Sequence, residues 1–145
     1  KLTLSIQEAL RLTAHTLGGL RKVVAPEGFN LKTSNDASFH VPCGEYIGLS
    51  HSLPNSDAAT FAKPRSFEPG RFHGKSFDDY EFTTFGQGRH LCPGRHYAEQ
   101  LMELILGELL KRFEFQVNGF LPALCYERAT LAQRAGACCL SYRAR

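Results

Sequence analysis

The residues best suited to chemistry lie in one glycine-rich stretch, from Phe85 to Gly94, which contains a single cysteine, Cys92. An amphipathic run follows directly, so the thiol is expected at the start of a helix. The positive end of a helix dipole favours thiolate over thiol, and a thiolate serves as a metal ligand or a nucleophile. The adjacent Arg89 and His90 suit a ligand that carries carboxylates, and glycines let a backbone approach a flat ligand closely. Iron, carboxylates and a flat face together describe a haem.

The order of residues in this stretch resembles the haem-binding loop of the cytochromes P-450, Phe-x-x-Gly-x-(Arg/His)-x-Cys-x-Gly. The match is specific because it covers five positions: Phe85, Gly88, His90, Cys92 and Gly94. The resemblance implies haem b as cofactor, with the Cys92 thiolate as the axial ligand and so as the metal-binding residue. It implies six haem-binding residues: Arg21, Phe85, Gly86, His90, Cys92 and Gly94. Arg89 could pair with a haem propionate in place of His90, and the sequence leaves that choice open.

A second signature lies near the N-terminus. Apolar residues recur at helical spacing from Leu2 to Leu17, and the glycine pair that follows is expected to end this helix. Glu8 and Arg11 are three residues apart and share one face of it. Taken alone, such a pair is a solvated ion pair of well under ~1 kcal/mol. Because the same chain also contains the Cys92 loop, the pair resembles the Glu-x-x-Arg signature of the family's K helix.

A third charged residue belongs with this pair. Residues 69–72, Pro-Gly-Arg-Phe, match the family's Pro-Glu-Arg-Phe segment, except that glycine replaces the acidic residue. In the family this arginine joins the Glu-x-x-Arg pair, so we expect a buried triad of Glu8, Arg11 and Arg71. Two guanidinium groups outnumber one carboxylate, so backbone carbonyls must complete the network. The triad is expected to hold the loops that carry the thiolate and to take no part in the chemistry.

Between these signatures the sequence predicts short strands and turns. Arg21 lies in a strand-like run and resembles the family's partner for a haem propionate; the alternative is a surface charge on a strand edge. The runs 39–41 and 46–49 read as the two strands of a hairpin, joined by a turn at 42–45. His51 opens a His-x-x-Pro segment similar to one that follows this hairpin in the family, and it is assigned no chemistry.

The C-terminal half also has a readable order of elements. Residues 73–84 predict an irregular but packed loop that resembles the family's meander. Apolar residues then recur every four positions, so a helix is expected from Arg95 to about Phe113, similar to the L helix. Residues 113–117 alternate like a strand. Beyond Phe115 the resemblance is only compositional, although residues 138–142 could form a strand.

These elements predict a mainly α fold with small β-sheets (α+β): the K helix, β hairpins, meander, Cys loop and L helix of a cytochrome P-450. We expect residues 1–145 to be the C-terminal part of one haem domain, because the helical pattern is already under way at Lys1. The N-terminal part, with the I helix that serves dioxygen and substrate in the family, is expected to be absent. No residue of this chain is therefore assigned as catalytic, and we expect the 145 residues alone to lack monooxygenase activity.

The resemblance implies a haem-thiolate monooxygenase that inserts one atom of dioxygen into an apolar organic substrate. Its redox partner would be an NADPH-dependent reductase. The eukaryotic style of the hairpin and loop indicates a full-length protein on the cytosolic face of the endoplasmic reticulum membrane, with membrane contact through an N-terminal anchor ahead of Lys1. Two alternatives stay open: a truncated, inactive remnant of a haem domain, and a haem-thiolate isomerase that rearranges a peroxide.

Composition and spacing argue against other classes. The net charge of +3, without a run of Lys or Arg, gives no footprint for nucleic acid, and no stretch approaches the ~20 apolar residues of a membrane span. Five cysteines without a Cys-x-x-Cys disfavour a disulfide framework and a zinc ribbon. A zinc site of His90, Cys92 and His96 lacks a fourth ligand at a usual distance. A dinucleotide site at the Gly-x-Gly of Gly86 lacks that motif's third glycine.

Overall fold

The computed structural model describes residues 1–14, 17–77, 80–125 and 133–145. The helices in these ranges are α1 (Leu2–Thr13), α2 (Ser52–Asn55) and α3 (Arg95–Arg112), with 3-10 turns at Pro69–Phe72 and Gly88–His90. The strands are β1 (Leu17–Lys22), β2 (Phe29–Lys32), β3 (Ser38–Val41), β4 (Tyr46–Ser50), β5 (Phe113–Asn118), β6 (Leu124–Cys125), β7 (Gln133–Arg134) and β8 (Cys139–Ala144). Each sheet that the structure describes is a two-stranded antiparallel ribbon. The prediction of helices combined with small β-sheets is confirmed.

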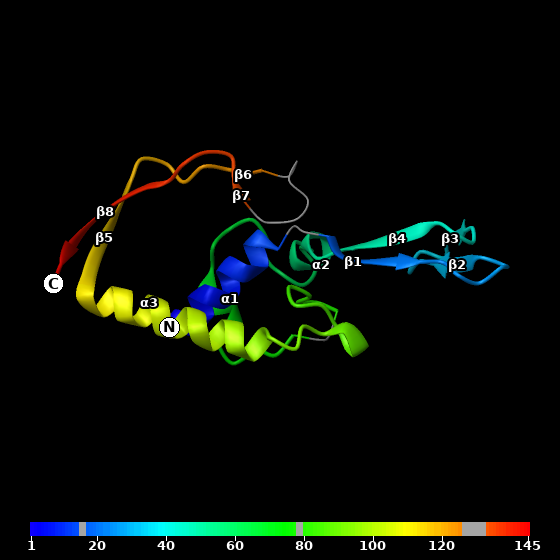
Figure 1. Ribbon diagram of the computed structural model, residues 1–145, viewed down its shortest axis with the longest axis horizontal. Coiled ribbons are helices and arrows are strands. Elements are labelled where there is room, and N and C mark those ends of the chain that lie inside the picture. Colours follow the sequence, from blue (N-terminus) through cyan, green and yellow to red (C-terminus); the bar gives the residue numbers. More distant parts are fainter. Residues whose placement is uncertain (15–16, 78–79, 126–132) are drawn as a thin grey trace.

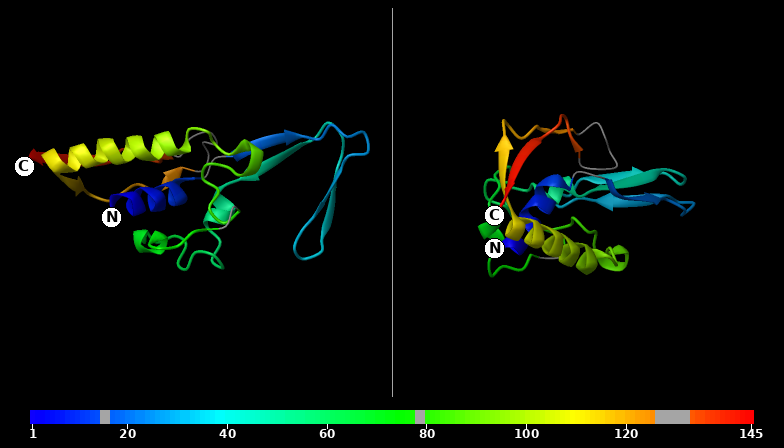
Figure 2. Two further views of the ribbon diagram at one scale, coloured as in Figure 1. Left: turned by 90° about the horizontal axis from the view of Figure 1, so that it is seen from below. Right: turned by 60° about the vertical axis from the view of Figure 1, so that its left-hand side comes forward.

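Two helices form the middle of the molecule, and ribbons extend from them in two directions (Figure 1). α1 contacts α3, α2 and the turn at Pro69–Phe72. The ribbons β1–β4 and β2–β3 reach out on one side, and β5–β8 follows α3 on the other. Figure 2 shows that β2–β3 turns away from β1–β4 rather than continuing its plane. The Cys92 loop enters α3 at the end of this helix that is nearer to the β1–β4 ribbon (Figure 1).

The helix α1 is shorter than its apolar spacing predicts. It ends at Thr13, and Leu17 already pairs with Ser50 of β4. The backbone groups of residues 17–22 form ladder hydrogen bonds with β4, which a continued helix would have used internally. The glycine pair that was expected to end the helix lies within β1 instead, at a shift of register between Leu17 and Gly19.

The expected hairpin of residues 39–41 with 46–49 is wrong. β3 pairs with β2, with Leu31 opposite Phe39, and β4 pairs with β1. The turn at 42–45 does form, but it carries the chain from one ribbon to the other. Val23 donates its N–H to the Glu45 carbonyl and accepts one from Gly44, so this turn lengthens the β1–β4 pairing. The extra strand, β2, alternates apolar and polar residues over only four positions, and it forms a local hairpin with β3.

The buried core is a cluster of phenylalanines in the irregular segment between α2 and α3. Phe61, Phe72 and Phe82 are buried, and Phe77 packs against them at ring-centroid distances of 5.0 Å from Phe61 and 5.1 Å from Phe72. Leu10 of α1 covers one side of this cluster. The expectation of a loop that is irregular but packed is confirmed for the described part of residues 73–84.

α3 has the bounds that were expected for it, and the structure describes all of its residues. None of their side chains is buried. Several large apolar residues of α3 expose more than a third of their surface to solvent: Tyr97, Leu101, Leu104, Ile105, Leu106, Leu109 and Leu110. The strand predicted at 113–117 is confirmed as β5, and it pairs with β8, which covers most of the run 138–142. Within the described ranges, none of the helices combines the length and the apolar character needed to cross a bilayer.

Candidate haem-thiolate site

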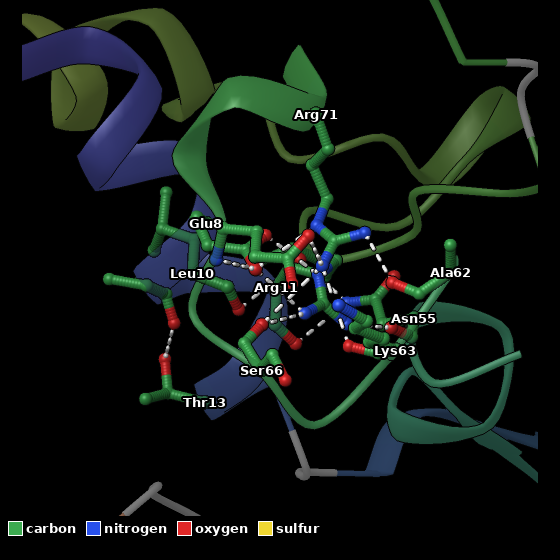
Figure 3. Close-up of polar contacts among 12 residues, drawn as sticks. Glu8, Leu10, Arg11, Thr13, Asn55, Ala62, Lys63, Ser66 and Arg71 are labelled. Atoms are coloured by element: carbon green, nitrogen blue, oxygen red, sulfur yellow. Dashed lines mark hydrogen bonds and ion pairs between the residues drawn. The ribbon is translucent and has the colours of Figure 1, made fainter. Parts of the chain in front are cut away.

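The structure brings Glu8 and Arg11 of α1 together with Arg71 (Figure 3). Arg11 grips the carboxylate with two parallel hydrogen bonds, Nε to Oε2 at 2.8 Å and Nη2 to Oε1 at 2.9 Å. Arg71 donates from Nε to Oε1 of the same carboxylate at 3.1 Å. The side chains of Glu8 and Arg11 are fully buried, and that of Arg71 is 9% exposed. A paired geometry of this kind is among the stronger charge-assisted contacts in proteins.

Backbone carbonyls and an aromatic ring meet the excess positive charge of the network. Arg11 donates from Nη1 to the Asn55 carbonyl at 2.6 Å, and Arg71 donates from Nη1 to the Ala62 carbonyl at 2.8 Å. The Phe61 ring lies under both cations, with its centroid 4.9 Å from Cζ of Arg11 and 6.0 Å from that of Arg71. The negative face of an aromatic ring attracts cations. The network thus fastens α1 to α2 and to the segment that precedes the Cys92 loop.

The carboxylate of Glu8 stays ionised despite its burial. Burial on its own would raise the pKa of Glu8. The hydrogen bonds from Arg11 and from the Glu68 N–H, together with the charges of Arg11 and Arg71, outweigh it and hold the pKa of Glu8 below its ordinary value. The charged form is therefore the one around which the network is built.

Cys92 lies between the 3-10 turn Gly88–His90 and the first turn of α3. Its N–H donates to the Phe85 carbonyl at 2.8 Å, and its carbonyl accepts from the Arg95 N–H at 3.2 Å. Gly86 has a φ of 73°, and a Cβ there would lie 3.2 Å from the His90 carbonyl oxygen. Glycine is therefore needed where the loop doubles back on itself. The backbone holds a half-buried thiol three residues before α3.

A cavity of about 360 Å³ opens beside this loop. Its lining includes three of the residues expected to bind haem, Arg21, Gly86 and His90, together with His51 and Gln87. The lining does not include Phe85, Cys92 or Gly94, which belong to the same described loop. Arg89 is not among the lining residues either, so of these two neighbouring residues it is His90 that lines the cavity. A guanidinium and two imidazoles can donate hydrogen bonds to carboxylates, so the lining of this cavity fits the propionates of a haem. The thiol of Cys92, which suits the iron, lies in the adjoining loop.

The cavity wall depends on Gly18, which the sequence analysis expected to end the first helix and not to line a cavity. A Cβ at Gly18 would lie 1.8 Å from Nε2 of His51, so the imidazole lies directly on the backbone of β1. Burial lowers the pKa of His51, which favours the neutral ring in this position. We expect Gly18→Ala to displace the ring and to destabilise the protein by about 1–3 kcal/mol, the usual cost of overpacking.

A double-mutant cycle checks this expectation by urea unfolding. In a His51→Ala background the ring is gone, so Gly18→Ala should cost much less than in the wild-type protein. An equal cost in both backgrounds would show that the contact between Gly18 and His51 does not limit the substitution.

Sequence reasoning missed Asn55, which is fully buried. The pattern directed attention to His51, which opens the same short segment, but the polar residue enclosed by the triad and the core is Asn55. Asparagine in a turn-rich stretch is ordinary in composition. The signal lies only in contacts between residues 44 positions apart, which the sequence does not display.

The zinc hypothesis finds no support in the structure. Among residues 1–14, 17–77, 80–125 and 133–145, no three His, Cys, Asp or Glu side chains are grouped so that they could hold a metal ion. The set of His90, Cys92 and His96 falls within these ranges. All five cysteines are free thiols.

Comparisons with known proteins agree on one family. The model of the family "Cytochrome P-450" matches residues 2–134. The cytochrome P-450 monooxygenase gloO of Glarea lozoyensis is 32% identical over 77% of this chain and 23% of its own length. A beta-amyrin 28-monooxygenase of Medicago truncatula is 31% identical over 75% of this chain and 21% of its own length. The chain therefore spans between a fifth and a quarter of the length of these two relatives.

The fold is also found in solved structures. The structure of cyanobacterial CYP120A1 with bound retinoic acid superimposes with a TM-score of 0.80 at 20% sequence identity. The match covers 98% of this chain and 32% of that one. The shared fold thus extends beyond Phe115, where the sequence resemblance was expected to become merely compositional.

Proposed function

The chain belongs to the cytochrome P-450 family, and from this premise we propose that it supplies the thiolate side of a haem-thiolate monooxygenase, with Cys92 as the axial iron ligand. One observation carries the proposal. Arg21, Gly86 and His90 come from segments more than 60 residues apart and line one cavity, next to the loop that holds Cys92 ahead of α3. Residues 1–145 would then form the C-terminal part of one haem domain.

In this proposal each residue of the chain has a defined task. Cys92 provides the thiolate, Arg21 and His90 pair with the propionates, and Gly86 and Gly94 let the backbone approach. Phe85 accepts the Cys92 N–H and keeps that end of the loop closed. Haem, when bound, supplies dioxygen activation, and a thiolate ligand favours O–O cleavage. Glu8, Arg11 and Arg71 fix the loop without entering the chemistry.

We propose the substrate and the redox partner as chemical classes and not as individual molecules. Relatives named as beta-amyrin 28-monooxygenases and a relative with bound retinoic acid support an apolar organic substrate. Monooxygenation consumes two electrons for each dioxygen, so we propose an NADPH-dependent reductase as redox partner. We further propose the cytosolic face of the endoplasmic reticulum membrane as the location of the whole protein.

A chimaera tests the proposed function. Residues 2–134 replace the corresponding segment of the Medicago truncatula beta-amyrin 28-monooxygenase, and the product is supplied with haem, reductase, NADPH and beta-amyrin. We expect oxidised product, dependent on NADPH, from the chimaera and none from its Cys92→Ser variant or from residues 1–145 alone. The control is the unaltered relative, assayed under the same conditions.

The same experiment separates the alternatives. A folded chimaera that takes up no haem would point to an inactive remnant and contradict the proposal. In a second arm, the chimaera receives a lipid peroxide in place of beta-amyrin and NADPH. Rearrangement of that peroxide, without NADPH-dependent oxidation of beta-amyrin in the first arm, would favour an isomerase and would also contradict the proposal.

A further inference from the structure

We propose that Asn55 is a positioning residue that sets the place of the Cys92 loop relative to α1. Its contacts are independent of any cofactor, whereas its consequence for iron ligation rests on the proposed function. No residue outside the triad was expected to have this role.

The side chain of Asn55 joins two segments that the sequence separates. It lies at the end of α2 and is fully buried. Its Oδ1 accepts the Thr83 N–H at 3.0 Å, and its Nδ2 donates to Oγ1 of Thr84 at 2.8 Å. Nδ2 also approaches the Arg11 carbonyl at 3.5 Å, while the Asn55 carbonyl accepts from Nη1 of Arg11 at 2.6 Å. The backbone carbonyl of Asn55 therefore contacts Arg11 of the triad (Figure 3), and its side-chain amide contacts the threonine pair, Thr83 and Thr84.

The threonine pair continues directly into the loop. Gly86 donates its N–H to the Thr83 carbonyl at 2.8 Å, and Phe85, the next residue after Thr84, accepts the Cys92 N–H at 2.8 Å. An unbroken series of hydrogen bonds and single peptide steps thus leads from the Glu8 carboxylate through Arg11 and Asn55 to the backbone of Cys92. A shift of Asn55 would move the start of the loop and, with it, the sulfur.

The chemistry of the site favours an amide. Thr83 is buried, so its N–H needs an acceptor, and Oδ1 provides it. Oγ1 of Thr84 approaches the Leu10 carbonyl at 3.5 Å and accepts from Nδ2. Leucine has the same branching of heavy atoms as asparagine but neither hydrogen-bonding function. Aspartate keeps the acceptor, and the Thr84 hydroxyl can turn to donate to it.

The experiment compares Asn55→Leu and Asn55→Asp in the full chain, with two readouts. The first is hydrogen exchange of the Thr83 amide in haem-free protein, which we expect to become faster by roughly tenfold in Asn55→Leu and to return near the wild-type rate in Asn55→Asp. The second is the ferrous–CO spectrum of haem-loaded protein, in which Asn55→Leu should lose at least half of the thiolate-type band. Thr84→Val removes only the hydroxyl partner and tests the same link whether or not Asn55→Leu folds.

A matched control separates positioning from stability. Ile6 is buried on α1 but makes none of these hydrogen bonds, so Ile6→Ala should destabilise the fold and leave both readouts nearer to wild type. Equal loss of the thiolate-type band in Ile6→Ala and Asn55→Leu, at equal stability, would overturn the inference. So would unchanged Thr83 exchange in Asn55→Leu and Thr84→Val. Faster Thr83 exchange in a protein whose wild type shows no thiolate-type band would support the positioning and contradict the proposed function.

Discussion

Replacing Cys92 with histidine is expected to abolish the red-shifted, thiolate-type band of the ferrous–CO haem protein. An imidazole donates less electron density to iron than a thiolate does, so haem bound through the introduced imidazole would give the spectrum of a nitrogen ligand. No other cysteine can take over in place: Cys43, Cys125, Cys138 and Cys139 all belong to other segments. The position also matters, because only the Cys92 N–H is tied to Phe85 and its carbonyl to the start of α3.

Cys43→Ser is the matched control for this prediction. Cys43 is exposed in the turn between the two N-terminal ribbons, so its removal should leave the spectrum as in the wild type. A thiolate-type band that persists in Cys92→His and disappears in Cys43→Ser would show that the iron ligand has been misassigned.

Glu8→Ala is expected to destabilise the protein by about 3–5 kcal/mol, the usual result of removing one partner from a buried charged network. Arg11 and Arg71 would be left with carbonyls and the Phe61 ring but no anion. Because the network fastens the segment that leads to Cys92, haem incorporation should fail as well, although Glu8 lies at the triad and not on the Cys92 loop.

Glu108→Ala gives the control, since Glu108 also pairs with two cations on a helix, Lys111 and Arg112, but is exposed. We expect no measurable change in unfolding or haem content for that variant. Soluble Glu8→Ala protein with a full complement of haem would contradict the role given to the network.

The same network predicts a dependence of stability on pH. The pKa of Glu8 is lower in the folded protein than its ordinary value of 4.5. The unfolded chain therefore binds the proton more tightly, so the contribution of the network is complete well above pH 4.5 and is lost as the pH falls through the folded pKa. Glu8→Gln resembles the protonated state, so the difference in unfolding free energy between wild type and Glu8→Gln should narrow on acidification.

What the sequence predicted well depends on short spacings. The Cys92 loop, the helix after Arg95 and the strand after Phe113 each have their pattern within a few residues. Their bounds in the structure differ from expectation by no more than a residue or two. The family resemblance followed from the same local patterns, and it is confirmed.

What the sequence did not predict depends on partners far along the chain. The turn at 42–45 was recognised, but it closes no hairpin because β4 pairs with β1, which lies on the other side of the β2–β3 ribbon in the sequence. α1 ends early because β4 competes for the backbone of residues 17–22. Asn55 and Phe61 both contact Arg11, which lies more than 40 residues before either of them. Such residues become visible only in three dimensions.

X-ray absorption at the iron edge of the haem-loaded wild-type protein tests the central claim most directly, because it detects the ligand atoms themselves. The account predicts a single sulfur atom in the first coordination shell, absent from Cys92→Ser and unchanged in Cys43→Ser. A first shell made only of nitrogen and oxygen in the wild type, or a sulfur that persists after Cys92 is replaced, would contradict it.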